Sequence, residues 1–181
     1  MTDPLAIAFT AGETGPWRIA ACTPVTGTAL PAAPRLAVTA AGAAPGGVWT
    51  LIGTTSNTRY ATRAETDALA ARQQGLGRPA ATCAALIPIR KSAAWWALAQ
   101  DERRDIFEAR SRHTAIGMDY LPQVARRLHH CRDLGGAYDF LTWFEYASDD
   151  AAAFERMVAR LRATEEWRYV EAEMDLRLER D

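Results

Sequence analysis

The stretch Tyr169-Val170-Glu171-Ala172-Glu173-Met174-Asp175-Leu176-Arg177-Leu178 lies close to the end of the 181-residue chain and alternates polar with apolar positions. Successive side chains of a β-strand point to opposite faces, so this alternation predicts a strand with one apolar and one polar face. We expect the apolar face to pack in a core. The acidic face is expected to meet water or a partner subunit.

A β-hairpin is predicted upstream of this strand. Its two strand candidates, residues 128–132 and 138–146, are joined by Asp133-Leu134-Gly135-Gly136, whose paired glycines suit a tight reversal. In the second strand Phe140, Thr142 and Phe144 share one face. Short apolar runs separated by glycine and proline predict further strands at residues 5–9, 17–21, 36–39, 48–52 and 82–89.

Three helices are predicted between these strands. Thr62 and Glu65 form a capping box ahead of good helix formers at residues 66–74. Residues 101–112 form a charged, amphipathic helix, with His113 at its end. A third helix follows Ser148, which can cap it, because apolar residues recur at helical spacing over 151–161.

The order of these elements predicts an α+β fold. Strand–helix–strand units with antiparallel hairpins, and with helices on one side, are typical of ferredoxin-like repeats. We therefore expect two such halves, residues 1–80 and 81–181. Their sheet can curl into an antiparallel β-barrel around a pocket.

The charge balance argues against a polyanionic partner. The chain has 21 basic and 22 acidic residues, interspersed, with a formal net charge of -1, so no nucleic-acid surface is expected. No run of about 18 apolar residues occurs and the first residues lack a signal-peptide pattern, so we expect a cytoplasmic protein without a membrane partner. Cys22, Cys83 and Cys131 are widely spaced and are expected to be small buried residues rather than disulfide or zinc ligands.

Few residues indicate chemistry from their pattern alone. His129 and His130 are neighbours on a predicted strand, so they face opposite ways and cannot jointly hold a metal. His113 has small, apolar neighbours against which a planar ligand could lie, although a structural role fits the same pattern. Lys91 is the only lysine in an arginine-rich chain. Dinucleotide-binding, P-loop and nucleophile-elbow motifs do not occur.

Several motifs follow one another in the second half of the chain: Lys91-Ser-Ala-Ala-Trp95-Trp96-Ala-Leu98, Ser111-Arg112-His113-Thr114-Ala115-Ile116-Gly117, Tyr120-Leu121-Pro122, Arg126-Arg127-Leu128, Arg132-Asp133-Leu134-Gly135, Asp139-Phe140-Leu141-Thr142-Trp143-Phe144-Glu145 and Thr164-Glu165-Glu166-Trp167. Together they resemble the chlorite dismutase family of haem proteins. Ser56-Asn57 and Arg59-Tyr60 extend a weaker likeness upstream. The length is similar to that of the short, dimeric branch of the family, in which the N-terminal half is truncated.

The resemblance implies a bound haem b. His113 matches its proximal axial ligand, and Glu166 matches the carboxylate that hydrogen-bonds the other ring nitrogen. Such an acceptor fixes the imidazole tautomer and raises its basicity as a ligand. Arg126 matches the distal arginine of members that degrade chlorite, and Gln73 resembles the glutamine that steadies it.

The residues beside Arg126 and Gln73 leave alternatives open. Strand alternation sends Arg126 and Arg127 to opposite faces, and the offset from His113 favours Arg126. The glutamine assignment could instead fall on Gln74. The resemblance also implies that Lys91 and Tyr60 contact the haem propionates or the pocket edge, and that Trp95, Trp96 and Trp143 pack around the porphyrin and the subunit interface. Thr142, Phe144 and Leu128 are expected to line the distal pocket, although core packing fits them equally well.

The activity implied by the resemblance is that of a homodimeric chlorite dismutase. Chlorite would become chloride and dioxygen through an oxoferryl intermediate and transient hypochlorite. A coproheme decarboxylase is a second interpretation, against which Arg126 and the chain length argue. A haem-binding sensor or weak peroxidase is a third, and a cofactor-free ferredoxin-like dimer with a structural His113 is the interpretation without an enzyme.

Overall fold

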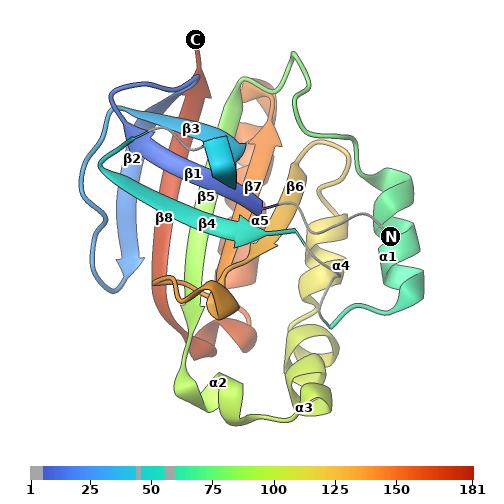
Figure 1. Ribbon diagram of the computed structural model, residues 1–181. Coiled ribbons are helices and arrows are strands. Elements are labelled where there is room, and N and C mark those ends of the chain that lie inside the picture. The colour runs from blue at the N-terminus through green and yellow to red at the C-terminus, as the bar shows by residue number, and fades with distance from the viewer. Residues whose placement is uncertain (1–5, 44–45, 56–59) are drawn as a thin grey trace.

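The computed structural model describes residues 6–43, 46–55 and 60–181. Within these residues it forms eight strands: β1 (Ala6–Gly12), β2 (Trp17–Thr26), β3 (Arg35–Ala40), β4 (Trp49–Thr54), β5 (Cys83–Lys91), β6 (Ala125–His130), β7 (Phe140–Tyr146) and β8 (Val170–Arg180). They pair in the order β1-β3-β2-β8-β5-β7-β6-β4 and close into an antiparallel barrel. The predicted α+β architecture with a barrel is confirmed (Figure 1).

The helices lie outside the barrel and gather on one side of it (Figure 1). They are α1 (Arg63–Arg72), α2 (Ala93–Ala97), α3 (Gln100–Arg104), the π-helical turn η2 (Asp105–Arg110), α4 (His113–Met118) and α5 (Ala151–Arg162). Four 3₁₀ turns complete the described elements: η1 (Ala41–Ala43), η3 (Arg132–Leu134), η4 (Ser148–Asp150) and η5 (Glu166–Tyr169). The capping box predicted at Thr62 and Glu65 is confirmed as the start of α1.

Apolar side chains fill the interior of the barrel. The apolar face of β8 packs there with Phe9, Trp17 and Trp143, all at most 2% exposed. Trp143 therefore belongs to the barrel core, and the expectation that it packs around a porphyrin or a subunit interface is wrong. The expectation that the barrel encloses a pocket is also wrong, because the cavity described below lies outside the barrel wall.

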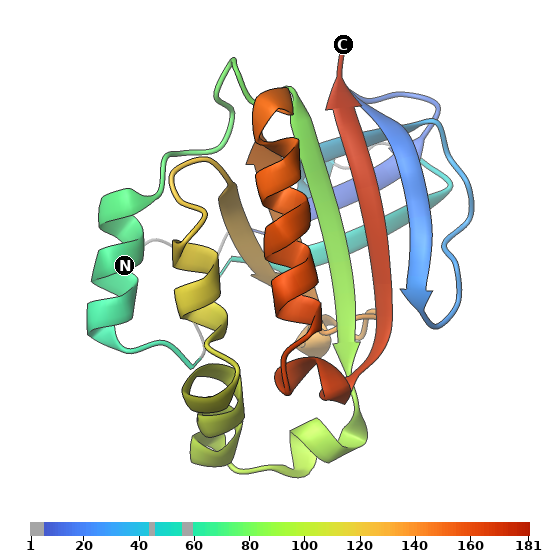
Figure 2. The ribbon, with the colours of Figure 1, turned by 180° about the vertical axis from the view of Figure 1, so that it is seen from behind.

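A second apolar cluster joins the outer face of β5 and β7 to α5. The helix contributes Phe154, Met157, Val158 and Leu161, which recur at helical spacing and are buried. Figure 2 shows α5 lying along this face, with α4 beside it. This layer separates the outer face of the sheet from solvent and leaves room for a cavity between sheet and helices.

The polar face of β8 meets water at Glu171 and Glu179, as expected, but its middle part is buried. Glu173 is 1% exposed and Asp175 is 6% exposed, both covered within this chain. Arg162 of α5 donates to Glu173 at 2.6 Å and to Asp175 at 2.7 Å. Arg177 also pairs with Asp175, at 2.5 Å. The alternating pattern identified the two faces correctly, but Arg162 of α5 covers Glu173 and Asp175 in the middle of the acidic face.

Two helix boundaries also differ from the expectation. The helix predicted at 101–112 is α3 followed by η2, and the chain then reverses at Arg112, whose φ is 52°. His113 consequently begins α4 instead of ending the preceding helix. Ser148 does not cap α5, because it begins the turn η4 and Asp150 precedes the helix.

Candidate functional site

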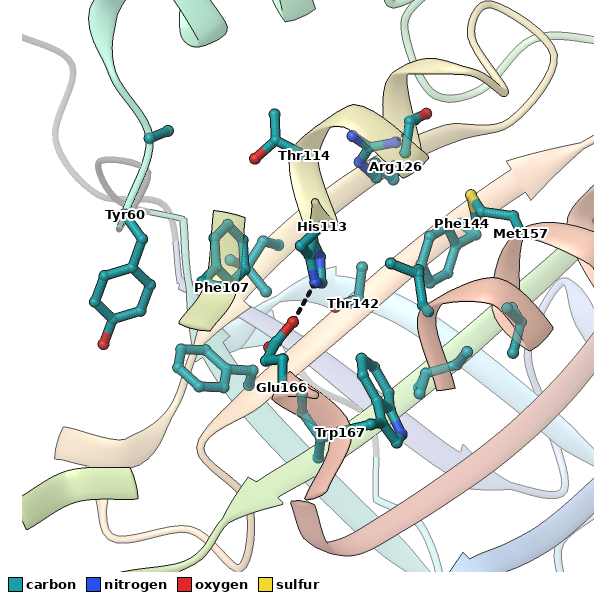
Figure 3. A pocket seen from close by; sticks show the side chains of 18 of the residues that line it. Tyr60, Phe107, His113, Thr114, Arg126, Thr142, Phe144, Met157, Glu166 and Trp167 are labelled. Atoms are coloured by element: carbon teal, nitrogen blue, oxygen red, sulfur yellow. Dashed lines mark hydrogen bonds and ion pairs between the residues drawn. The ribbon is translucent and has the colours of Figure 1, made fainter. Parts of the chain in front are cut away.

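A cavity of about 220 Å³ lies between the helices and the outer face of β5, β6 and β7 (Figure 3). All ten site residues predicted from the sequence line it: Tyr60, Gln73, Lys91, Trp95, His113, Arg126, Leu128, Thr142, Phe144 and Glu166. Ile87 and Ile89 of β5 and Val158 and Leu161 of α5 add apolar walls. The tertiary structure therefore brings together residues that are spread over more than half of the chain.

Strand alternation explains the sheet side of the cavity. Thr142 and Phe144 point the same way from β7, as the sequence predicted. The register pairs Arg126 of β6 with Phe144, and Leu128 with Thr142, so all four side chains share the outer face. Arg127, between them on β6, is exposed and does not line the cavity. The expected opposite orientation of the two arginines is confirmed.

His113 is held through one of its ring nitrogens. Its Nδ1 lies 2.6 Å from Glu166 Oε2, and the Glu166 side chain is 3% exposed (Figure 3). Lys91 Nζ donates to the other carboxylate oxygen, also at 2.6 Å, and is 2% exposed. Nδ1 is thus engaged by a carboxylate, which leaves Nε2 as the nitrogen available to a ligand in the cavity.

The pKa of Glu166 reflects this surrounding charge. Burial by itself would raise the pKa of a carboxyl group, because it disfavours the charged form. The charges and hydrogen bonds of His113 and Lys91 outweigh burial and lower the pKa to about 2. Glu166 is therefore a carboxylate at neutral pH and accepts from both partners.

Side-chain hydrogen bonds hold the start of α4 and the segment that carries Glu166. Glu108 accepts from the backbone N–H groups of Thr114, at 2.7 Å, and Ala115, at 3.3 Å. A carboxylate at this end satisfies donors that have no partner within the helix and favours its dipole. Ser111 Oγ accepts from the N–H of Glu166 at 2.9 Å. This hydrogen bond ties the Glu166 backbone to the segment that precedes His113.

Aromatic rings flank the His113 imidazole. Phe107 stacks on it with ring centroids 4.3 Å apart and planes 21° apart. Trp167 lies further away, at 6.5 Å and 20°. Its indole N–H donates to the buried Glu173 at 2.8 Å. Rotation of the imidazole is restricted by the Phe107 ring as well as by Glu166.

Arg126 brings a positive charge into the cavity without a matching acid. Its Nη1 donates to the carbonyl oxygen of Gly117 at 2.9 Å, and Figure 3 shows the guanidinium beside the α4 backbone. No carboxylate among the described residues forms an ion pair with it. Burial lowers its pKa to about 10, which still leaves it charged at neutral pH. A half-buried cation without an acidic partner favours an anionic ligand.

The two neighbouring glutamines have different surroundings. Gln73 ends α1 and lines the cavity, and its buried Oε1 has no hydrogen-bond partner among the described residues. Gln74 lies outside the cavity lining, and its Oε1 accepts from Arg78 at 2.8 Å. The geometry favours Gln73 as the pocket residue. Gln73 forms no direct hydrogen bond with Arg126 among the hydrogen bonds of the described residues.

Lys91, Tyr60 and Trp95 form the far wall. The Lys91 ammonium, expected at the cavity edge beside a propionate, is buried against Glu166 and lies 4.7 Å from the Trp95 ring centroid. Tyr60 meets the Trp95 ring edge to face, at 5.9 Å. Its hydroxyl accepts from Arg103 Nη1 at 3.1 Å. Ser56, Asn57 and Arg59, which carried the weaker upstream likeness, lie outside the described residues.

Three residues of the site were not predicted to have their roles. Phe107 was expected only as part of the helix predicted at residues 101–112, and Trp167 and Gly117 only as members of motifs. The spacing of Gly117 four residues after His113 was an available signal, because positions i and i+4 share one helix face. The contacts of Phe107 and Trp167 depend on the path of the chain at Arg112 and had no such signal.

The donor set suits a metal that brings its own ligands. No group of three or more His, Cys, Asp or Glu side chains able to hold a metal ion occurs within the part of the chain that the structure describes. The imidazole of His113 is the only one that lines the cavity within the described residues, and its Nε2 is the free ring nitrogen. Nε2 of His113 would supply one nitrogen ligand to a metal whose other ligands come from an organic cofactor. None of the described helices is long and apolar enough to cross a membrane.

Comparison with known proteins supports one family. The family model described as chlorite dismutase matches residues 22–178. The crystal structure of dimeric chlorite dismutases from Nitrobacter winogradskyi is similar, with a TM-score of 0.90 and 55% identity, over 96% of this chain and 99% of that chain.

Two longer proteins are similar over part of their length. A chlorite dismutase mutant from Candidatus Nitrospira defluvii has a TM-score of 0.60 and 27% identity, over 80% of this chain and 56% of that chain. A curated chlorite dismutase from Ideonella dechloratans is 33% identical over 84 residues, which is 46% of this chain and 27% of that protein. The likeness therefore spans about half or less of the longer relatives.

Proposed function

The chain belongs to the chlorite dismutase family, and from this premise we propose that it converts chlorite into chloride and dioxygen with haem b bound in the cavity. His113 Nε2 would bind the iron, and the apolar walls contributed by β5, β7 and α5 would contact the porphyrin. When bound, the haem iron supplies the redox chemistry that breaks the chlorine–oxygen bonds and joins the oxygen atoms.

The proposed role of Glu166 is to set the donor strength of His113. The carboxylate holds the proton on Nδ1, which directs the lone pair of Nε2 into the cavity. An anionic acceptor on Nδ1 raises the basicity of the imidazole. Lys91 orients the carboxylate by donating to its second oxygen. This buried chain of hydrogen bonds favours higher oxidation states of a bound metal.

The proposed role of Arg126 is to attract and retain anions. Chlorite is an anion, and so is the hypochlorite that an oxygen transfer leaves behind. A guanidinium offers directed N–H donors and a charge that persists at neutral pH. The absence of an acidic partner among the described residues leaves that charge available to the substrate.

The observation that carries the proposal is the meeting of two features in one cavity: an imidazole hydrogen-bonded to a buried carboxylate, and a half-buried guanidinium without an acidic partner among the described residues. A cofactor-free structural dimer has no use for the second feature. The homodimer, the cytoplasmic location and the division into a truncated first half and a haem-binding second half are further proposals. The dimeric Nitrobacter relative supports the first of these.

The test combines cofactor binding with oxygen release. The full chain reconstituted with haem should show a ferric Soret band and release dioxygen from chlorite at an oxygen electrode. His113→Ala should weaken haem binding sharply. Haem binding without oxygen release would contradict the chlorite activity and favour a sensor or weak peroxidase, and conversion of iron coproporphyrin with peroxide would favour a decarboxylase. A chain that takes up no haem would refute the proposal.

A further inference from the structure

Gly117 has no side chain at the point where Arg126 meets α4. A Cβ built on Gly117 would lie 2.5 Å from Arg126 Nη2, 2.6 Å from Nη1 and 2.7 Å from Cζ. Real Cβ atoms essentially never approach other heavy atoms within 3.0 Å. The guanidinium therefore occupies the space that any other residue at position 117 would need.

The same residue also anchors the guanidinium through its backbone. The carbonyl oxygen of Gly117 accepts from Arg126 Nη1 at 2.9 Å. Gly117 is buried in α4 and lies four residues after His113, so both residues are on the cavity side of one helix. A hydrogen bond to a charged donor at close range ties the Arg126 charge to the helix that carries the imidazole.

We propose that Gly117 is a positioning residue that sets where the charge of Arg126 lies in the cavity. Its missing side chain makes the space for the guanidinium, and its carbonyl fixes the orientation. The consequence for chlorite turnover rests on the proposed function, whereas the packing relationship does not. Any larger residue at position 117 would move the charge and change which anions the cavity binds.

Gly117 lies within a helix, where glycine is intrinsically unfavourable. Glycine is among the poorest helix formers, and alanine at a compatible helical position stabilises a protein, partly by restricting the unfolded chain. The atoms in the way are the far end of a flexible side chain, so Gly117→Ala should displace Arg126 and leave the α4 backbone intact. This variant is therefore expected to fold, and its defects would be traceable to Arg126.

The first experiment measures thermal unfolding of the full chain without added haem. Gly117→Ala should raise the midpoint in the Arg126→Ala background, where the space is empty, and should raise it less or lower it when Arg126 is present. We expect the two effects to differ by about 2–4 °C or more. Gly42→Ala, where a Cβ meets nothing within 4 Å, is the matched control and should act equally in both backgrounds. Equal effects of Gly117→Ala would overturn the proposal.

The second experiment titrates fluoride against the haem-loaded protein by visible absorption. Gly117→Ala should raise the Kd for fluoride about tenfold, comparable to Arg126→Ala, because a charged donor has moved. In the Arg126→Ala background the same change should alter the Kd less than about twofold. Unchanged fluoride affinity in Gly117→Ala would contradict the positioning role. If no haem is taken up, the proposed function fails, and the unfolding cycle still decides the relationship between Gly117 and Arg126.

Discussion

His113 and Arg126 come from different elements, helix α4 and strand β6, and their side chains line one cavity. The imidazole is tied to a carboxylate buried below it, and the guanidinium is tied to the backbone of the same helix, at Gly117. An imidazole and a guanidinium without an acidic partner among the described residues therefore share one cavity. The predictions below separate the contributions of these two groups.

Replacement of Glu166 by glutamine should affect both folding and the bound metal. Lys91 would be left buried without an anionic partner, and breaking a buried pair in this way costs about 3–5 kcal/mol. The imidazole would lose its charged acceptor, so the Fe(III)/Fe(II) reduction potential of bound haem should rise. Chemical denaturation and spectroelectrochemical titration measure the two effects.

Glu165 supplies the matched control for that change. It is the neighbouring glutamate, is partly exposed, and pairs only with the exposed Arg110 among the described residues. Exposed ion pairs of this kind contribute about 0–1 kcal/mol. Glu165→Gln should therefore leave the reduction potential where it is. Equal shifts in the two variants would contradict the role assigned to Glu166.

Removal of the Arg126 side chain should change the fate of the products. Without the guanidinium we expect more hypochlorite to escape and the haem to bleach sooner, because nothing charged retains the anion. Trapping of hypochlorite during turnover and the decay of the Soret band measure this. Arg127→Ala is the control, because the Arg127 side chain is exposed and does not line the cavity. Unchanged oxygen yield and haem lifetime in Arg126→Ala would count against the proposed role.

Replacement by leucine should have different effects at the two glutamines that follow α1. Gln73→Leu removes a buried oxygen without a partner among the described residues, so stability should stay level or rise by up to about 1 kcal/mol. Chlorite turnover should nevertheless change, because a polar group leaves the cavity. Gln74→Leu breaks only an exposed contact with Arg78 and should leave turnover unaltered. A turnover defect confined to Gln74→Leu would reverse the assignment.

The buried His129 should make the free energy of unfolding depend on pH, independently of the cavity. It is 2% exposed among barrel residues, and burial lowers its pKa from 6.5 to about 4, although a hydrogen bond with Leu141 opposes the shift. The unfolded chain binds a proton as the pH falls below 6.5, while the folded chain does so only near 4. Stability should therefore decline by at most about 3 kcal/mol over that interval and level off below it.

His129→Gln isolates this contribution, because its amide can still form a hydrogen bond but does not titrate. Its free energy of unfolding, measured from pH 8 to pH 4, should fall less steeply between 6.5 and 4 than that of the parent chain. Parallel curves for the two proteins across that range would show that His129 does not titrate as predicted.

Much of the architecture was predictable because it rests on local periodicity. Short apolar runs indicated β1 to β5, alternation indicated β7, β8 and their faces, and a capping box located α1. The strand predicted at residues 128–132 is β6, which begins three residues earlier and ends two residues earlier. Motifs in sequence order contain nine of the ten predicted site residues, and all ten are among the residues that line the cavity. These signals depend on neighbouring positions along the chain, where side-chain direction follows from backbone geometry alone.

The sequence by itself predicted ten site residues, all of which line one cavity, and which face of each strand they occupy. Only the tertiary structure decided that the barrel interior is packed and the cavity lies outside it, that α5 buries Glu173, and that Lys91 pairs with Glu166. It also decided that Gly117 makes room for Arg126. The physical reason is that these contacts join segments distant in the chain, whose meeting depends on how the sheet closes and where each helix is anchored.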